Sequence, residues 1–450
     1  MELIESVKIA IEKALKFGAN QADAYASRSY STSIQATNDK IGGLKDRRAS
    51  SEMIEGLGIR VIVNKSVAYA YTTILDESNI EEAVKTAIKL AKVKDPDPEF
   101  KSLPEAETPT KVGGIFDSSI TDPPIDDAFE SIRKVLGEGM EANPNFNTVI
   151  SGYDFSWTER AIANTLGVEV NFKESVASTG VYIIGEKNGL TTTGGEFDEN
   201  RELKKISIEK CLEEAIKYAR LGLNKAKIEA GEKTVIFQPE ALASLMNYAF
   251  IEPINAYNVQ EGKSYLAGKI GKQVASEKLT IIDDGTISGG LYTAPVDDEG
   301  VPTQKTIIIE KGILKNYLYD SYTAFKENKK STGNAFRRFR SAIEISPRNH
   351  IIIGETVKID ELIGDVKEGI LVRGVMGAHS TNIATGAFSV LANPAYVIIN
   401  GEITGQIKGC MIAGTFQELL NKYIAQGDDA VQKRFLISPS VKFEKVRIAL

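Results

Sequence analysis

The sequence predicts an α+β protein in which a mixed α/β N-terminal lobe precedes a β-rich C-terminal domain. Apolar residues recur at helical spacing in the first 20 residues and again over 77–93, with strand-like segments between them. Beyond residue 230 the apolar pattern is mostly that of strands separated by turn residues. A chain of 450 residues can bury more than one core, so two or three domains are expected.

The N-terminal lobe is expected to hold two helices and several strands. The first helix should stop at Gly18, because glycine commonly follows a helix end. Residues 23–75 shorten to a strand pattern, with a turn at Asn64-Lys65 between the last two strands. A second helix is predicted over 77–93.

A proline-rich segment follows at 94–110 and holds four of the fourteen prolines. Proline continues neither a helix nor a central strand, so we expect a linker or wrapping loop there. The predicted domains are therefore an α/β domain at 1–93, this linker, a central α/β region at 111–228 that can join the first domain in one lobe, and a β-rich domain at 229–450.

The central region is expected to begin with a helix over 123–142 and to end with one over 206–221. Cys211 falls on the apolar stripe of the second helix, which indicates a buried small hydrophobe and not a nucleophile. Four strands are predicted between the helices, at 147–155, 157–166, 168–175 and 176–184.

The last 220 or so residues open with a strand at 233–238 and a helix at 239–252. Two hairpins are predicted later, one turning at 310–312 and one at Asn400-Gly401. The remaining pattern is mostly strands.

Composition narrows the class of function. The formal charge of -7 argues against a nucleic-acid surface as the main role. No apolar stretch approaches membrane-spanning length, and the N-terminal segment has no basic head followed by an apolar run. The two cysteines lie far apart, at Cys211 and Cys410, which favours a reducing, cytoplasmic compartment.

Zinc chemistry needs three or four ligands drawn from histidine, cysteine and carboxylates. The chain has only two histidines. His350 lies just ahead of an apolar strand, where an imidazole at a strand edge is the expected role. His379 lies in a glycine-rich loop without a partner nearby in the sequence, and His379 and Ser380 are too close along the chain to predict a facing base and nucleophile.

Charged runs are interpreted first as turn and surface features. The acidic residues at 283–284 and 297–299 each precede a glycine, which is typical of turns. The FRRFR run at 336–340 could bind single-stranded nucleic acid through stacking and phosphate contacts. On an acidic chain with one such cluster, we expect a solvated loop or a partner-facing patch.

Several segments spread over nearly the whole chain resemble the TldD/TldE (PmbA) peptidase family. They include GLGIRVIVNKSVAYAYTT, VASEKLTIIDDG at 274–285, STGNA at 331–335, and the tract from GILVRGVMGAHSTNIATGAFS to NGEI. The TNIATGAFS core is similar to the TldE/PmbA branch, although that branch more often has Asp where Ala387 stands.

The resemblance also locates the positions that hold zinc in the TldD branch, where a helix carries HExxxH and a cysteine near the C-terminus is the third ligand. Counting back from VASE without gaps, the three helix positions are Asn247, Tyr248 and Glu252. The resemblance of AVQKRFLISP near the C-terminus places the cysteine position at Lys433. None matches. On an ideal α-helix two residues five apart point about 140° from each other, so the HExxxH pair needs a widened turn. Pro253 is expected to end or kink the helix at Glu252.

The resemblance implies a cytosolic two-subunit peptidase in which this chain is the TldE-like subunit, without metal or catalytic residues of its own. Zinc would lie in a TldD-like HExxxH partner, with unfolded or extended peptides as substrates and a homodimer as a further possibility. Candidate residues lining a peptide cavity are Tyr248, Asn334, His379 and Asn382. Two alternatives stay open: a self-sufficient hydrolase without zinc, and a homodimeric peptide-binding scaffold.

Overall fold

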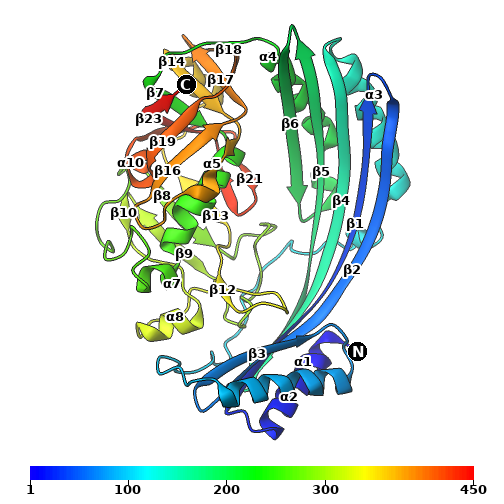
Figure 1. The fold of residues 1–450 in the computed structure, drawn as a ribbon, viewed down its shortest axis with the longest axis vertical. Coiled ribbons are helices and arrows are strands. Elements are labelled where there is room, and N and C mark those ends of the chain that lie inside the picture. The colour runs from blue at the N-terminus through cyan, green and yellow to red at the C-terminus, as the bar shows by residue number, and fades with distance from the viewer.

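A computed structural model describes all 450 residues. The first part of the chain builds one antiparallel sheet of six strands, in the order β3-β2-β1-β4-β5-β6. Four of these strands are unusually long and run along the length of the molecule (Figure 1). The strands are β1 (Gln21–Asp39), β2 (Gly43–Val63), β3 (Ser66–Thr72), β4 (Phe146–Asn164), β5 (Glu169–Lys187) and β6 (Leu190–Asn200).

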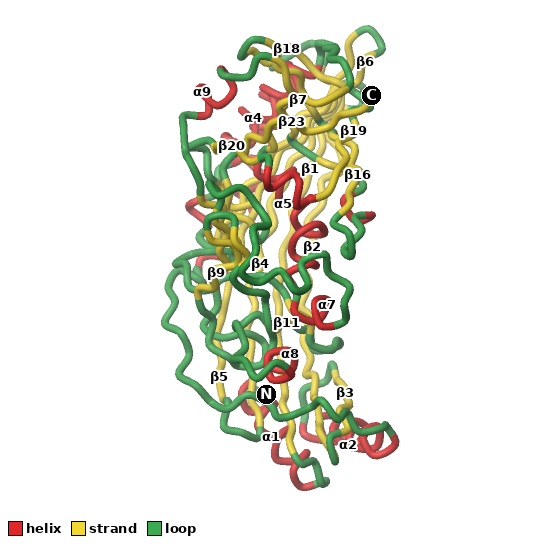
Figure 2. Tube along the Cα trace, turned by 90° about the vertical axis from the view of Figure 1, so that its left-hand side faces the viewer, coloured by secondary structure: helices red, strands yellow, loops and turns green.

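Two pairs of helices give this sheet two separate apolar cores. α1 (Leu3–Lys16) and α2 (Glu77–Val93) cover one end, and α3 (Ile125–Glu141) and α4 (Ile208–Gly222) cover the other. In both views α1 and α2 lie at one end of the molecule and β18 (Glu402–Ile407) lies near the other (Figure 1, Figure 2). All four predicted helices are confirmed, and α2 has the predicted bounds.

The turn between β2 and β3 is also confirmed. Asn64 and Lys65 both adopt positive φ, 51° and 69°, as a two-residue hairpin turn requires. After α2 the chain forms no helix or strand until a short 3₁₀ turn at Ser118–Thr121, as the prolines of 94–110 predicted.

The predicted strand breaks near residues 156 and 175 are wrong. β4 and β5 run straight through these positions, and β6 was not predicted at all. β4 passes from one core to the other, so its middle is only partly buried and the apolar alternation fades near residue 156, where it looked like a turn. In β5 every second residue from Ser175 to Ile183 is buried, so the strand alternation continues through the predicted break.

The second half, residues 229–450, contains two larger sheets around the main core. The turns at residues 311–312 and at Asn400-Gly401 join the predicted hairpins, although β10 is only two residues long. The strands are β7 (Gly231–Phe237), β8 (Thr280–Asp284), β9 (Lys305–Glu310), β10 (Ile313–Leu314), β11 (Ala335–Phe336), β12 (Glu344–Ile345), β13 (His350–Ile353), β14 (Glu368–Val372), β15 (Val375–Met376), β16 (Ala387–Ala392), β17 (Ala395–Ile399), β18, β19 (Met411–Thr415), β20 (Tyr423–Gln426), β21 (Val431–Lys433), β22 (Leu436–Ser438) and β23 (Val441–Ala449).

The helices of the second half are short. They are α5 (Pro239–Met246), α6 (Glu252–Ile254), α7 (Ala256–Gln260), α8 (Ser321–Lys326), α9 (Ile359–Gly364) and α10 (Phe416–Asn421). Strands therefore dominate this half, and the predicted α+β class is confirmed. None of the helices in the structure combines the length and the apolar character needed to span a membrane.

Candidate functional site

The helix that carries the three family positions contains a π turn. α5 ends at Met246, residues Asn247–Ile251 form the π turn, and α6 continues to Ile254. A π turn hydrogen-bonds residue i to residue i+5, which brings residues five apart onto one face of the helix. Asn247 and Glu252 therefore share a face, so the widened turn that an HExxxH pair needs is present.

Pro253 does not end the helix at Glu252, contrary to the sequence expectation. Glu252 has φ −60° and ψ −45°, which is α-helical geometry, and the helix continues through Pro253. In a regular α-helix the proline ring would clash with the carbonyl four residues earlier. The π turn widens the helix before Pro253 and relieves this clash.

Tyr248 and His379 lie together on the surface beside the π turn. Their rings meet edge to face with centroids 6.5 Å apart, and both side chains are exposed. His379 belongs to a 3₁₀ turn, Ala378–Ser380. The Ser380 hydroxyl donates to the carbonyl of Gly377 at 2.7 Å and not to His379, so these two residues do not form a base and nucleophile pair.

Tyr265 connects the π turn to the loop that contains Asn382. Its hydroxyl donates to the carbonyl of Ala249 at 3.1 Å, and its backbone N–H donates to the carbonyl of Ile383 at 3.0 Å. Burial raises the pKa of Tyr265, which keeps the phenol protonated as a donor. No motif in the sequence pointed to Tyr265.

Asn382 itself is exposed, and its side chain shapes its own loop. The Oδ1 atom accepts from the backbone N–H groups of Ala384 at 3.0 Å and Thr385 at 3.2 Å. This arrangement is an Asx-type turn. The structure thus brings three of the four cavity candidates, Tyr248, His379 and Asn382, to the region around the π turn.

Asn334 lies in a separate buried cluster. Its Nδ2 donates to Asp283 at 2.8 Å and to the carbonyl of Ser346 at 3.0 Å. Asp283 also lies 2.9 Å from Nδ1 of His350. His350 is completely buried between the rings of Phe250 and Phe435, on a strand flanked by β8 and β22. The expectation of a strand-edge imidazole is therefore wrong.

Lys433 joins the second half of the chain to the N-terminal sheet. Its Nζ donates to Glu196 at 2.6 Å and to the carbonyl of Phe197, and lies 3.9 Å from the centre of the Phe197 ring. Burial disfavours the ionised Glu196, but Lys433 and Arg373 together hold its pKa below the usual range. Lys433 is thus ion-paired with Glu196 of the N-terminal sheet.

These residues do not fit a zinc site. Tyr248 presents a phenol, and the Glu252 carboxylate accepts a hydrogen bond from Asn258 Nδ2 at 3.1 Å. The paired ammonium of Lys433 stands at the position of the expected thiolate and has no lone pair to donate. One carboxylate and one amide on a helix face are too few donors for zinc.

The acidic run at 297–299 is more than a turn. Gly300 has φ 85°, as a turn requires, but all three carboxylates are buried. Glu299 accepts from Arg60 Nη2 at 2.9 Å, and Asp298 accepts from Arg160 Nη1 at 3.1 Å. Both arginines belong to the long sheet, so this run docks the second half onto it.

The basic run at 336–340 is divided between the interior and solvent, so the expectation of a wholly solvated or partner-facing patch is wrong. Arg337 is buried and lies 3.0 Å from Asp23 of the long sheet. Phe339 packs in a small apolar cluster with Tyr25. Only Arg338 and Arg340 are exposed. Sequence patterns missed this network because the partners are hundreds of residues apart.

Comparisons with known proteins cover nearly the whole chain. Three family models match it: the PmbA/TldA metallopeptidase domain 1 at residues 22–91, the central domain at 118–223 and the C-terminal domain at 230–450. An uncharacterised protein of Methanocaldococcus jannaschii is 31% identical over 438 residues, which cover 96% of this chain and 98% of that protein.

Two further relatives carry family names. A protein named metalloprotease PmbA homolog of Haemophilus influenzae is 26% identical over 100% of this chain and 96% of its own. The crystal structure of TldE from Thermococcus kodakarensis is 30% identical, covers 99% of this chain and 100% of that one, and superposes with a TM-score of 0.90. The chain therefore belongs to the PmbA/TldD metallopeptidase family.

Proposed function

We propose that this chain is the TldE/PmbA-like subunit of a cytoplasmic TldD/TldE-type metallopeptidase and holds no zinc of its own. The observation that carries the proposal is the π turn, which keeps the widened geometry of a metal helix but presents Asn247, Tyr248 and Glu252. The ion-paired Lys433 supports it, because a buried ammonium repels a metal cation.

The catalytic step would then belong to a TldD-like partner with an intact HExxxH helix, in which zinc activates water for attack on a peptide bond. This chain would contribute surface to the peptide chamber through Tyr248, His379 and Asn382 around the π turn. Unfolded or extended peptides are the expected substrates, because an extended backbone can pair as an added strand.

The test combines metal analysis with peptide cleavage. We expect the purified chain alone to contain far less than one zinc per molecule and to leave an unfolded peptide intact. After co-expression with an HExxxH relative, the two chains should purify together with zinc and cleave the peptide. Replacing the first His of the partner's motif should abolish cleavage without separating the chains.

Stoichiometric zinc and peptide cleavage by the chain alone would overturn the proposal. A chain that neither cleaves alone nor binds any HExxxH relative would overturn it as well, in favour of a peptide-binding scaffold.

Substituting His379 by Ala in the complex tests whether His379 contacts the bound peptide or takes part in catalysis. We expect a higher KM with kcat nearly unchanged, because a residue that binds substrate and transition state equally changes only KM.

A further inference from the structure

The surface around the π turn is built from two segments that lie far apart in the sequence. One is the helix at 247–254, which presents Tyr248, and the other is the loop at 378–386, which presents His379. The rings of these two residues meet, but both side chains are exposed. Exposed side chains change rotamer readily, so this contact alone does not fix how the helix and the loop lie relative to one another.

The helix contains a carbonyl that cannot receive its usual donor. In an α-helix the carbonyl of Ala249 would accept the N–H of the residue four positions later, which is Pro253. Proline has no N–H. Ala249 is completely buried, and a buried carbonyl without a donor costs free energy. The Tyr265 hydroxyl donates to this carbonyl at 3.1 Å and takes the place of the missing N–H.

Ser264, the residue before Tyr265, holds the helix but not the loop. Its hydroxyl donates to the carbonyl of Pro253 at 2.6 Å and accepts from the N–H of Leu266 at 3.0 Å. Neither hydrogen bond reaches residues 378–386. Ser264 therefore ties the helix to its own segment, whereas Tyr265 hydrogen-bonds both the helix and the loop.

Tyr265 holds the loop through its backbone and its ring. Its N–H donates to the carbonyl of Ile383 at 3.0 Å. Its ring lies against Gly386, where an added Cβ would lie 3.0 Å from the nearest ring atom. Gly386 has φ 73° and donates its N–H to the carbonyl of Asn382 at 2.7 Å, so it closes the turn that begins at Asn382. The ring thus packs on the turn that presents Asn382.

We propose that Tyr265 is a positioning residue of the peptide-binding surface, and that its hydroxyl sets where the π turn lies relative to the Asn382 loop. Without the hydroxyl the ring stays on Gly386, but the Ala249 carbonyl loses its donor and the helix is no longer tied to the loop. A bound peptide must then order the two segments itself, which weakens its affinity. The inference rests on the proposed function for what this surface binds, whereas the link between the two segments does not depend on it.

The first test measures this link in the full chain by amide hydrogen exchange followed by mass spectrometry. Tyr265→Phe keeps the ring and removes only the hydroxyl. We expect the amides of residues 247–254 to exchange roughly fivefold to tenfold faster relative to the rest of the chain, the size expected for the loss of one hydrogen bond. The amides of residues 378–386 should also exchange faster, because the ring that packs on this loop is held less firmly.

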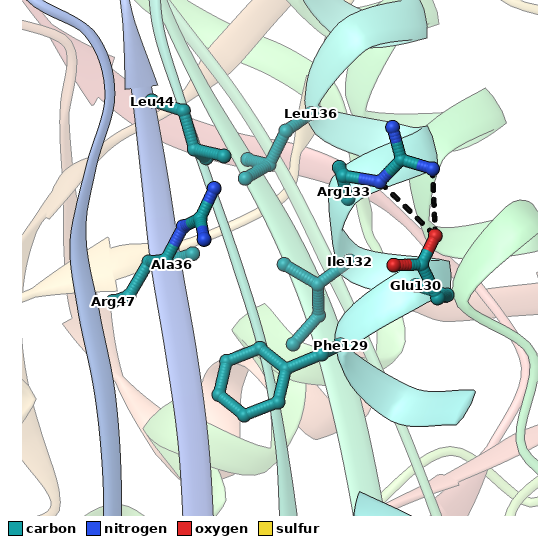
Figure 3. Close-up of a pocket in the computed structure, with 8 residues that line it drawn as sticks. All are labelled: Ala36, Leu44, Arg47, Phe129, Glu130, Ile132, Arg133 and Leu136. Atoms are coloured by element: carbon teal, nitrogen blue, oxygen red, sulfur yellow. Dashed lines mark hydrogen bonds and ion pairs between the residues drawn. The ribbon is translucent and has the colours of Figure 1, made fainter. Parts of the chain in front are cut away.

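Tyr396→Phe is the matched control. Tyr396 is also buried, and its hydroxyl also donates to a backbone carbonyl, that of Tyr218, at 3.1 Å. This variant should leave the relative exchange of residues 247–254 as in the wild type. Arg133→Ala is a second control, in the N-terminal lobe, where Arg133 forms an ion pair with Glu130 at a hollow of about 200 Å³ beside α3 (Figure 3). It should also leave this exchange unchanged.

The second test measures peptide cleavage by the complex with the HExxxH partner. We expect Tyr265→Phe to raise KM about fivefold while kcat stays within about twofold of the wild type, because a less ordered surface weakens the binding of substrate and transition state alike. A loss of folded protein would instead lower the apparent kcat and leave KM unchanged, so KM is the informative quantity. Tyr396→Phe should have the KM of the wild type.

Unchanged exchange of residues 247–254 in Tyr265→Phe, or an equal increase in Tyr396→Phe, would overturn the inference. Equal KM values for the wild type and Tyr265→Phe, in a complex that cleaves the peptide, would overturn it too, although the proposed function would then stand. If no complex with an HExxxH relative cleaves the peptide, the proposed function is wrong, and the exchange experiment alone decides whether Tyr265 links the helix to the loop.

Discussion

At the scale of single residues, Arg60 of β2 links the long sheet to the second half of the chain. Its guanidinium donates to both carboxylate oxygens of Asp23, at 2.8 and 2.9 Å, and to Glu299 at 2.9 Å. The guanidinium and both carboxylates are almost fully buried. One side chain therefore forms ion pairs with an acid of the long sheet and an acid of the second half.

We predict that Arg60→Ala lowers the free energy of unfolding by about 3–5 kcal/mol, because it leaves the buried Glu299 without its cation and Asp23 with Arg337 alone. Denaturant titration followed by circular dichroism measures this change. Arg133→Ala is the matched control, since Arg133 forms an ion pair with Glu130 in which both side chains are about two-thirds exposed. Such a pair contributes at most about 1 kcal/mol. Equal losses for the two variants would refute the role given to Arg60.

The same network shows that ion-pair partners far apart in the chain could not be predicted from the sequence. The acidic run at 297–299 and the glycine after it correctly indicated a turn. The ion pair that gives the run its role joins residues 239 positions apart. No local pattern encodes which arginine will meet which carboxylate, because the match depends on how two folded parts dock.

At the scale of elements, predictions succeeded where periodicity and end signals agreed. α2 begins after Asp76, whose side chain accepts the N–H of Asn79, and its apolar stripe continues to Ala91. The family positions at 247, 248 and 252 were placed on one helix, and the structure confirms that helix. A widened turn was expected only in a helix that carries the zinc motif, and not from this sequence itself. Whether a helix widens locally depends on its hydrogen-bond register, which the amino-acid composition does not reveal.

Whether the π turn places residues 247 and 252 on one face of the helix can be tested. We predict that the double variant Asn247→His with Glu252→His binds Zn²⁺ at least tenfold more tightly than the wild-type chain, because the π turn aligns residues five apart. The matched control is Arg133→His with Glu138→His on α3, where the same spacing on a regular α-helix separates the two side chains by about 140°. Isothermal titration with Zn²⁺ measures both constants. Equal affinity of the two double variants would show that the widened turn does not bring the pair together.

At the scale of the whole molecule, the long sheet and the second half meet through buried charges at two places. Arg60 and Arg160 meet the acidic run at one contact, and Lys433 and Arg373 meet Glu196 at the other. Buried ion pairs require exact geometry, so they fix how the two parts dock more than they add to stability. This arrangement holds the surface around the π turn in place relative to the long sheet.

The acids at the first contact also couple this docking to pH. Burial, followed by the nearby Glu299 carboxylate, raises the pKa of Asp297 to about 8. The same two causes raise the pKa of Asp320 to about 6. In the unfolded chain both groups lose their protons near pH 4, whereas the folded protein retains them to higher pH. Their contribution to stability is therefore complete below about pH 4 and is lost as pH rises through 6 and then 8.

We predict that the free energy of unfolding falls between pH 5 and 8, with a slope of up to about 1.4 kcal/mol per pH unit for each proton retained only by the folded state. Asp297→Asn removes one of these protons, so the slope should become flatter, most clearly above pH 6. The slope is the informative quantity, because the amide also changes the hydrogen bond from Ala335 N–H and shifts the absolute stability. Asp154→Asn, at an exposed carboxylate of the long sheet, is the control and should leave the slope unchanged. Denaturant titrations at several pH values measure all three proteins, and a slope in Asp297→Asn equal to that of the wild type would show that Asp297 is already ionised in the folded state.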